Sequence, residues 1–136
     1  MKAALKKTML RQSPFIASDG GINIKDLAKA LNIDQATVAS ASGSSRQIVS
    51  QHFKAKNKFI KIRNKNAHDF WAKLNQIYTL LLGLTDSERS SSEIKEWFNS
   101  PNQALNMERP IDLIRRNEHD ILIKKLMDII NAAHGG

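Results

Sequence analysis

The sequence lacks cysteine and has little proline. None of its 136 residues is Cys, which excludes disulfides, a thiol nucleophile, and zinc or iron–sulfur sites with Cys ligands, and which fits a reducing cytoplasm. Only three prolines occur. No long window shows the strict alternation of period two that is typical of strands, whereas helical spacing recurs along the chain. We therefore expect an all-α fold.

Long apolar runs are also missing. The run over residues 78–82 is short and is interrupted by Thr79, whereas a membrane-spanning helix needs ~20 predominantly apolar residues. Residues 1–10 are basic but lack a continuous apolar stretch with a small-residue cleavage site, so we expect no signal peptide. The expected location is the cytoplasm, without membrane contact.

Residues with catalytic or metal-binding chemistry are sparse. The four histidines form no close i, i+4 pair, and no carboxylate spacing completes a metal site; they are His52, His68, His119 and His134. The serines at 90–92 have no partnered base, and Asp19-Gly20-Gly21 is typical of a turn rather than of a phosphate-binding loop. We expect no catalytic residue, no metal and no cofactor, so the chain is not predicted to be an enzyme.

Positive charge is concentrated in the first half of the chain. The overall net charge is +8. Residues 1–68 contain 13 Lys or Arg and 3 Asp or Glu, whereas residues 69–136 contain 8 and 10. A basic half attracts phosphate backbones and a nearly neutral half does not. The two halves are therefore expected to have different partners, with DNA as the partner of the first.

Capping residues and apolar spacing predict a series of helices. The expected N-caps are Asn23, Asp34, Ser44 or Ser45, and Asn117, and Gly43 and Gly83 end two of the helices. The predicted helices span 3–11, 24–31, 35–42, 46–53, 66–82, 93–98 and 118–133, with a further short one that begins at Pro110. The lysine-rich residues 54–65 are interpreted as a linker. We therefore expect a DNA-binding region over residues 1–65 and a second helical region over 66–136.

Three of these helices have apolar faces with distinct expectations. The helix over 46–53 is expected to bury Ile48, Val49 and Phe53. The stripe on the helix over 66–82 is either core or a two-fold dimer contact; it consists of Phe70, Trp71, Leu74, Ile77, Tyr78 and Leu81. The stripe on the last helix is either core or partly an exposed interface; it consists of Ile121, Leu122, Leu126, Ile129 and Ile130.

Residues 37–49 have the spacing of a helix-turn-helix. Ala39 is small enough for the helix crossing, Gly43 tolerates the left-handed backbone of the turn, and Val49 packs the second helix onto the first. The second helix then exposes side chains suited to base edges and phosphates, and the lysines after it add backbone contacts. The predicted DNA-binding residues are Ser45, Arg46, Gln47, Ser50, Gln51, Lys54, Lys56 and Lys58.

A second helix-turn-helix register also fits. It places Ala28 at the crossing, Asn32 at the turn and Val38 in the packing position, with recognition by residues 35–41. That recognition helix has few long polar side chains, so we prefer the first register and keep the second as an alternative.

The C-terminal half carries an ordered set of motifs. Trp97, the Pro101-Asn102 pair and Leu105 precede Pro110-Ile111-Asp112-Leu113-Ile114, and a long apolar helix follows. This order resembles the C-terminal toxin-binding domain of Xre/MbcA/ParS-type antitoxins, and residues 27–31 and 39–49 resemble the family's helical DNA-binding region. The resemblance covers residues 22–134. The family often has glycine where this chain has Asn106-Met107, and a small residue or glycine within the stretch that 117–119 occupy here.

This resemblance implies a bacterial type II antitoxin that acts as a homodimer. Its partner would be a RES-domain toxin that consumes NAD or transfers ADP-ribose, and its C-terminal segment would cover the toxin's active site. The N-terminal helix-turn-helix would bind operator DNA and repress the operon. The carried-over toxin contacts are Arg109, Asp112, Arg115, Arg116, Asn117, Glu118, His119 and Lys124. The alternative is a stand-alone helix-turn-helix regulator with an unidentified effector.

Overall fold

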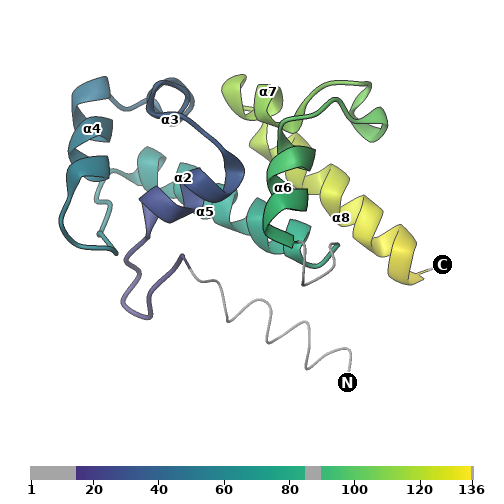
Figure 1. Cartoon of the computed structure of the whole chain (residues 1–136), viewed down its shortest axis with the longest axis horizontal. Coiled ribbons are helices and arrows are strands. Elements are labelled where there is room, and N and C mark those ends of the chain that lie inside the picture. The colour runs from purple at the N-terminus through teal and green to yellow at the C-terminus, as the bar shows by residue number, and fades with distance from the viewer. Residues whose placement is uncertain (1–14, 85–89, 136) are drawn as a thin grey trace.

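The computed structural model describes residues 15–84 and 90–135, and these form an all-α fold (Figure 1). The helices are α2 (Ile24–Leu31), α3 (Gln35–Ser42), α4 (Arg46–Lys54), α5 (Lys65–Leu82), α6 (Ser90–Phe98), the 3-10 turn η1 (Gln103–Leu105), α7 (Pro110–Arg115) and α8 (His119–Gly135). Within the described ranges, β-structure is limited to isolated bridges. The all-α prediction is confirmed, and the helix expected over 3–11 lies outside the described residues.

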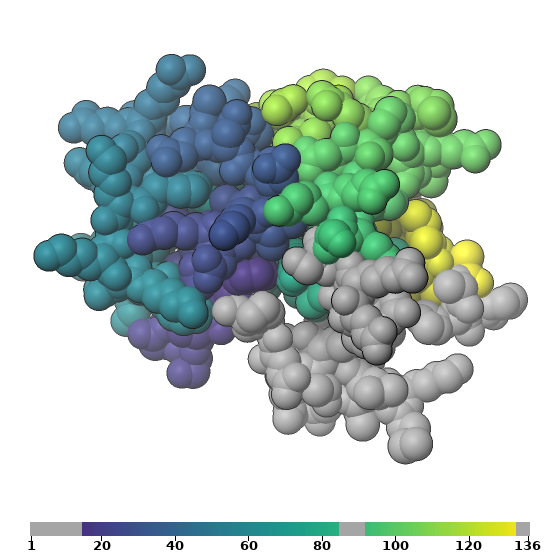
Figure 2. All heavy atoms as spheres, in the orientation of Figure 1, coloured from purple at the N-terminus to yellow at the C-terminus, as the bar shows by residue number. Residues whose placement is uncertain are grey.

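The 18-residue helix α5 connects the two halves of the molecule. It packs against α2 and α3 of the N-terminal half and against α6 and α8 of the C-terminal half. Figure 1 shows α4 at one end of the molecule and the end of α8 at the other, with α5 running between them. Helix α7 lies beside α3, and the atoms of the two adjoin in the space-filling view of Figure 2. One continuous cluster of buried side chains extends from Phe15 to Leu126. The regions expected over 1–65 and 66–136 therefore share a core.

The lysine-rich residues 54–65 are attached to the rest of the chain near their middle. The Ile22 N–H donates to the Ile60 carbonyl at 2.8 Å, and the Ile60 N–H donates back to the Ile22 carbonyl at 3.0 Å. Ile62 is buried. This segment is thus a linker only in part, because the backbone pair and Ile62 fix the path of the chain from α4 to α5.

Local caps explain why the predicted helix boundaries in the N-terminal half agree closely with the structure. The Asp34 carboxylate accepts from the Thr37 N–H at 2.8 Å, and the Ser45 hydroxyl accepts from the Ile48 N–H at 3.1 Å. The hydrogen bonds at Thr37 hold the pKa of Asp34 below its ordinary value. Gly43 ends α3 with a φ of 72°, a left-handed conformation that favours glycine. The sequence between α2 and α5 thus specifies its own helix ends.

The prediction that Asn117 caps the start of the last helix is wrong. Asn117 has a φ of 61° and lies just after α7. Its N–H donates to the Ile114 carbonyl at 3.0 Å, and the Glu118 N–H donates to the Leu113 carbonyl at 2.8 Å. These two bonds form a Schellman motif, which ends a helix through a left-handed residue. Asn117 therefore ends α7.

Ile48, which is predicted to be buried, is on the surface, and so is Ile121, for which the sequence leaves both core and exposed interface open. Ile48 is 46% exposed and Ile121 is 48% exposed, because each lies beside the apolar row that packs inward. Val49 anchors α4 to the core, and Leu122 and Leu126 anchor α8. The α5 stripe, by contrast, is entirely buried within this chain; it consists of Phe70, Trp71, Leu74, Ile77, Tyr78 and Leu81. As this stripe packs inside the chain, it is core and does not form a two-fold contact.

Candidate DNA-binding and protein-binding surfaces

A short turn joins α3 to α4, the pair for which the sequence predicts a helix-turn-helix. The three residues 43–45 join the helices, with Gly43 left-handed and Ser45 as the N-cap of α4. Ala39 is buried on α3, and Val49 of α4 is buried in the same core. The α2–α3 turn is equally short, with Asn32 left-handed at a φ of 57° and Asp34 as the next N-cap. Turn length therefore fits both registers.

Exposure distinguishes α3 from α4. Most of α3 is buried, and its exposed side chains are Gln35, Ala36 and Ser40. In α4 only Val49 is fully buried. The predicted DNA-binding residues are brought together on α4 and directly after it: Ser45, Arg46, Gln47, Gln51, Lys54, Lys56 and Lys58 are exposed, and Ser50 is half-buried. Compared with α3, α4 therefore presents more exposed side chains of the kind that can reach base edges, and the choice between the two registers stays a prediction.

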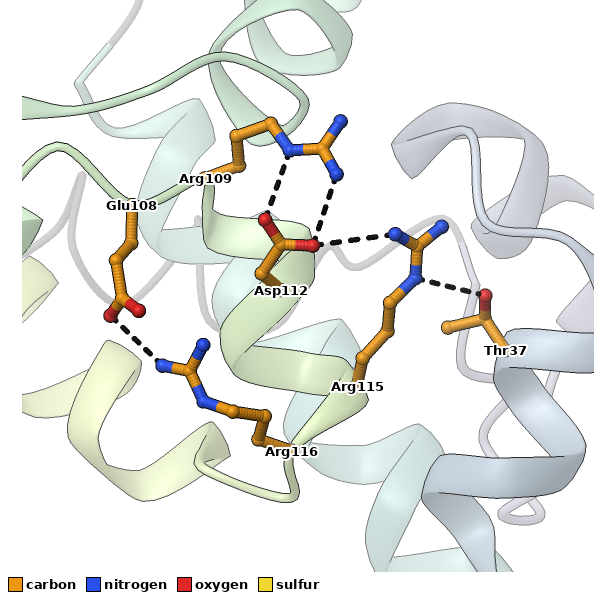
Figure 3. A network of polar contacts seen from close by, with 6 residues as sticks. All are labelled: Thr37, Glu108, Arg109, Asp112, Arg115 and Arg116. Carbon is orange, nitrogen blue, oxygen red and sulfur yellow. Dashed lines mark hydrogen bonds and ion pairs between the residues drawn. The ribbon is translucent and has the colours of Figure 1, made fainter.

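The predicted toxin contacts at α7 form an ion-pair network (Figure 3). Arg109 donates to both carboxylate oxygens of Asp112, from Nε at 3.0 Å and from Nη2 at 3.1 Å. Arg115 donates to the same carboxylate at 3.3 Å and to the Thr37 hydroxyl of α3 at 3.4 Å. Figure 3 shows the Asp112 carboxylate between the two guanidinium groups. Arg109 and, less strongly, Arg115 hold the pKa of this carboxyl below its ordinary value.

A second arginine centre lies beside the first. Arg116 pairs with Glu108 at 2.9 Å and with Glu118, and these hydrogen bonds raise the pKa of its guanidinium. The paired side chains are all partly exposed, and such surface pairs contribute little to stability. Five of the eight predicted toxin contacts thus form one polar surface; they are Arg109, Asp112, Arg115, Arg116 and Glu118. Asn117 and Lys124 are exposed nearby in the sequence.

His119 does not belong to this exposed surface. Its side chain is only 6% exposed, and its ring makes an edge contact with Phe70 at a centroid distance of 5.2 Å. Its Nε2 is buried without a hydrogen-bond partner. The first turn of α8 directs His119 onto α5, so in this structure its side chain is not exposed for the predicted toxin contact, which stays a prediction.

The burial of His119 has a consequence for stability. Desolvation and the nearby Lys73 lower its pKa from the ordinary value of 6.5, against an opposing contribution from Asp120. Lys73 and Asp120 also form an ion pair with each other at 3.0 Å. The folded chain thus keeps His119 neutral under conditions in which the unfolded chain takes up a proton. Because the pKa of His119 is lower in the folded state than in the unfolded state, the stability that the neutral ring contributes is present above pH ~6.5. This stability is lost as the pH falls.

We expect His119→Leu to reduce the loss of stability between pH 7.5 and pH 5. The variant removes the titrating group and also an unpartnered buried nitrogen, which by itself costs about 1–3 kcal/mol. Urea unfolding at several pH values measures the effect. His68→Gln is the control, because His68 is exposed. His52, whose pKa burial also lowers, remains in both variants. An equal dependence on pH in the two variants would contradict the prediction.

The apolar residues on the outside of α8 were not identified as a separate face from the sequence. Ile121 and Met127 are 48% and 46% exposed, and the exposed Lys124 lies between them at helical spacing. We call these three residues the α8 outer face. The angular offset of Ile121 and Met127 from Leu122 and Leu126 was only a partial signal, because Ile123 has the same offset of about 100° from Leu122 and is buried.

The described part of the chain contains no obvious ion site or transmembrane segment. Across residues 15–84 and 90–135, no three His, Asp or Glu side chains gather as metal ligands. In the same ranges, every helix is too short or too polar to cross a bilayer. Comparison of the chain with models of known families, with curated proteins and with solved structures finds no significant match.

Proposed function

We propose that this chain is a DNA-binding antitoxin of a type II toxin–antitoxin system. In this proposal α4 enters the major groove of operator DNA and represses the operon. The surface of α7 and α8 binds a RES-domain toxin and covers the active site at which that toxin consumes NAD or transfers ADP-ribose. A homodimer would present two copies of α4 to a palindromic operator.

The exposed face of α4 is the observation that carries this proposal. Gln47 and Gln51 lie one turn apart on α4 and are exposed, and the start of the helix exposes Arg46. Arg and Gln are the side chains that form bidentate contacts with guanine and adenine edges. The half of the chain that contains α4 has the excess of basic residues. Position, side-chain chemistry and charge thus all support DNA binding.

The backbone conformation of three residues supports the resemblance to the antitoxin family. Asn106, Met107 and Asn117 have φ values of 55°, 65° and 61°. Two of these positions are where the family often has glycine, and the third lies in the stretch that often contains a small residue or glycine. Glycine adopts this left-handed conformation without steric cost, and asparagine tolerates it better than most residues. The chain therefore has a left-handed backbone at the positions where the family often has glycine or a small residue.

Met107 is the most strained of the three, and we expect Met107→Gly to stabilise the chain. Its side chain is 63% exposed, so little apolar burial is lost. The left-handed conformation costs an L residue roughly 1–2 kcal/mol, and the extra entropy of glycine in the unfolded chain offsets part of this. The expected gain is about 0.5–1 kcal/mol in urea unfolding. Gln103→Gly, at an exposed position within η1, is the control and should destabilise. A loss of stability in Met107→Gly would contradict the prediction.

Co-expression with the neighbouring reading frame tests the proposed function. We expect a protein that is lethal when expressed alone, a stable complex with this chain, and a stoichiometry from native mass spectrometry that shows whether two copies of α4 are present. A harmless neighbour and a lone homodimer would overturn the antitoxin proposal and leave the stand-alone regulator.

The toxin-binding surface is best tested by a point substitution. Removal of the residues after 105 would delete α7 and α8 and expose the core around Leu122 and Leu126. Lys124→Glu instead reverses a charge within the α8 outer face, and Lys29→Glu makes the same change on the exposed side of α2. We expect Lys124→Glu to neutralise the toxin less well than the unmodified chain, and Lys29→Glu to neutralise it as well as the unmodified chain.

A further inference from the structure

A groove of about 360 Å³ runs along one side of α4. Its walls come from the α3–α4 turn, the side of α4 that carries Ile48 and His52, the segment before α5, and the first turn of α5. The lining residues are Gly43, Ser44, Ser45, Ile48, His52, Lys61, Ile62, Arg63, Asn64 and Ala67. The groove therefore lies between α4 and the segment that leads back from α4 to α5. The Ile22–Ile60 backbone pair fixes the position of this segment.

The lining of the groove is positive. Lys61 and Arg63 contribute two cationic side chains, His52 contributes an imidazole, and the lining contains no Asp or Glu. Lys61 lies 4.0 Å from Asp19, with both side chains well exposed, so this pair restrains Lys61 only weakly. Arg63 is exposed and forms no ion pair among the described residues. Both cations are therefore available to an anionic ligand.

Two helices also begin at this groove. Ser45 and Asn64 are the N-caps of α4 and α5, and both line it. Each cap satisfies one N–H, that of Ile48 or that of Ala67. Further N–H groups in each first turn have no partner within their helix. The start of a helix favours negative charge, so the helix ends reinforce the charge of Lys61 and Arg63.

The groove is adjacent to the row of α4 that carries Gln47 and Gln51. Ile48 and His52 form the next row of the helix, rotated by about 100°. A helix ~10–12 Å across fills a major groove ~12 Å wide, so backbone phosphates lie along both of its sides. When Gln47 and Gln51 face the bases, the row beside them faces one of these backbones.

We propose that this groove binds a phosphate group of the DNA backbone, held by Lys61 and Arg63 at the starts of α4 and α5. The inference rests on the proposed DNA binding by α4 and adds a phosphate site to it. The contact is independent of base sequence, so it positions α4 in the major groove while Gln47 and Gln51 select bases. Ile48, on the wall of the groove, would lie between the phosphate contact and the bases.

The salt dependence of DNA binding tests this site. Fluorescence anisotropy would measure the affinity of the full chain for the duplex upstream of its own gene and for a scrambled duplex, from 50 to 200 mM salt. The probed variant is Lys61→Gln/Arg63→Gln. The control is Lys95→Gln/Lys125→Gln, which removes the same charge at two exposed positions on α6 and α8 that belong to no predicted contact. Each lost phosphate contact reduces the magnitude of the slope of log K against log[salt] by ~0.9.

We expect the slope of log K against log[salt] to decrease in magnitude in Lys61→Gln/Arg63→Gln by the amount that corresponds to about two phosphate contacts. The fall in affinity across this salt range would then be about tenfold smaller than for the unmodified chain. The loss should be similar for both duplexes, because phosphate contacts do not depend on sequence. A slope equal to that of the Lys95→Gln/Lys125→Gln control would overturn the phosphate site while leaving DNA binding intact. If the unmodified chain binds neither duplex, the proposed function itself fails and the site fails with it.

Discussion

If α4 recognises operator DNA as proposed, replacement of both Gln47 and Gln51 with alanine is expected to abolish most of the preference for the operator. Each well-placed bidentate contact to a base contributes about 1–3 kcal/mol of discrimination. The double variant should therefore lose about 2–6 kcal/mol, which corresponds to roughly 30-fold to 10⁴-fold in affinity. Both side chains are exposed, so their truncation should leave the stability of the fold nearly unchanged.

The measurement compares the operator with a scrambled duplex of the same length. Loss of base contacts lowers affinity for the operator alone, whereas loss of phosphate contacts lowers affinity for both duplexes. This difference separates Gln47 and Gln51 from Lys61 and Arg63, although all four residues lie on or beside α4. Thermal unfolding of the variant checks that the affinity loss does not come from loss of structure.

Gln35→Ala is the matched control, since Gln35 is the exposed glutamine of α3. It makes the same chemical change on the helix that the alternative register uses for recognition. If α4 is the recognition helix, Gln35→Ala should change the affinity for the operator little. A large loss in Gln35→Ala together with unchanged binding in the α4 variant would show that α3 recognises the bases.

Local signals made the helix ends of the N-terminal half predictable. Asn23, Asp34 and Ser45 each form their cap with a backbone N–H three residues further along the chain. Such a bond depends on a few consecutive residues, and the left-handed Gly43 ends α3 by an equally local conformation. The expected helix over 24–31 and that over 35–42 have the same bounds in the structure. Helix ends that depend only on neighbouring residues can therefore be predicted from a short stretch of sequence.

Contacts between distant segments were not predictable in the same way. His119 has the sequence context of a charged helix start, yet it packs on Phe70, which lies in α5. Arg115 approaches Thr37, a residue 78 positions earlier. The groove along α4 depends on the return of residues 61–64 past that helix. Each of these features arises from tertiary packing, so neither spacing nor composition indicates it.

The last prediction concerns Trp71, which lies on α5 within the shared core. It is 1% exposed, and its ring lies 5.3 Å from Phe70 and 6.3 Å from Phe53 of α4. Trp71→Ala should destabilise the chain by about 3–5 kcal/mol, because truncation of a buried aromatic removes apolar burial and leaves a cavity. For a chain of this length, the melting temperature should fall by about 10–20 °C.

The form of this transition distinguishes one cooperative unit from two. If the regions over 1–65 and 66–136 unfold together, as their common core indicates, Trp71→Ala shifts a single transition by its full amount. Calorimetry should then show one peak, with calorimetric and van't Hoff enthalpies in agreement. Trp97→Ala is the control, because Trp97 is the other tryptophan and is only partly buried, so a smaller shift is expected. A second peak that neither substitution moves would show that a part of the chain folds independently of α5.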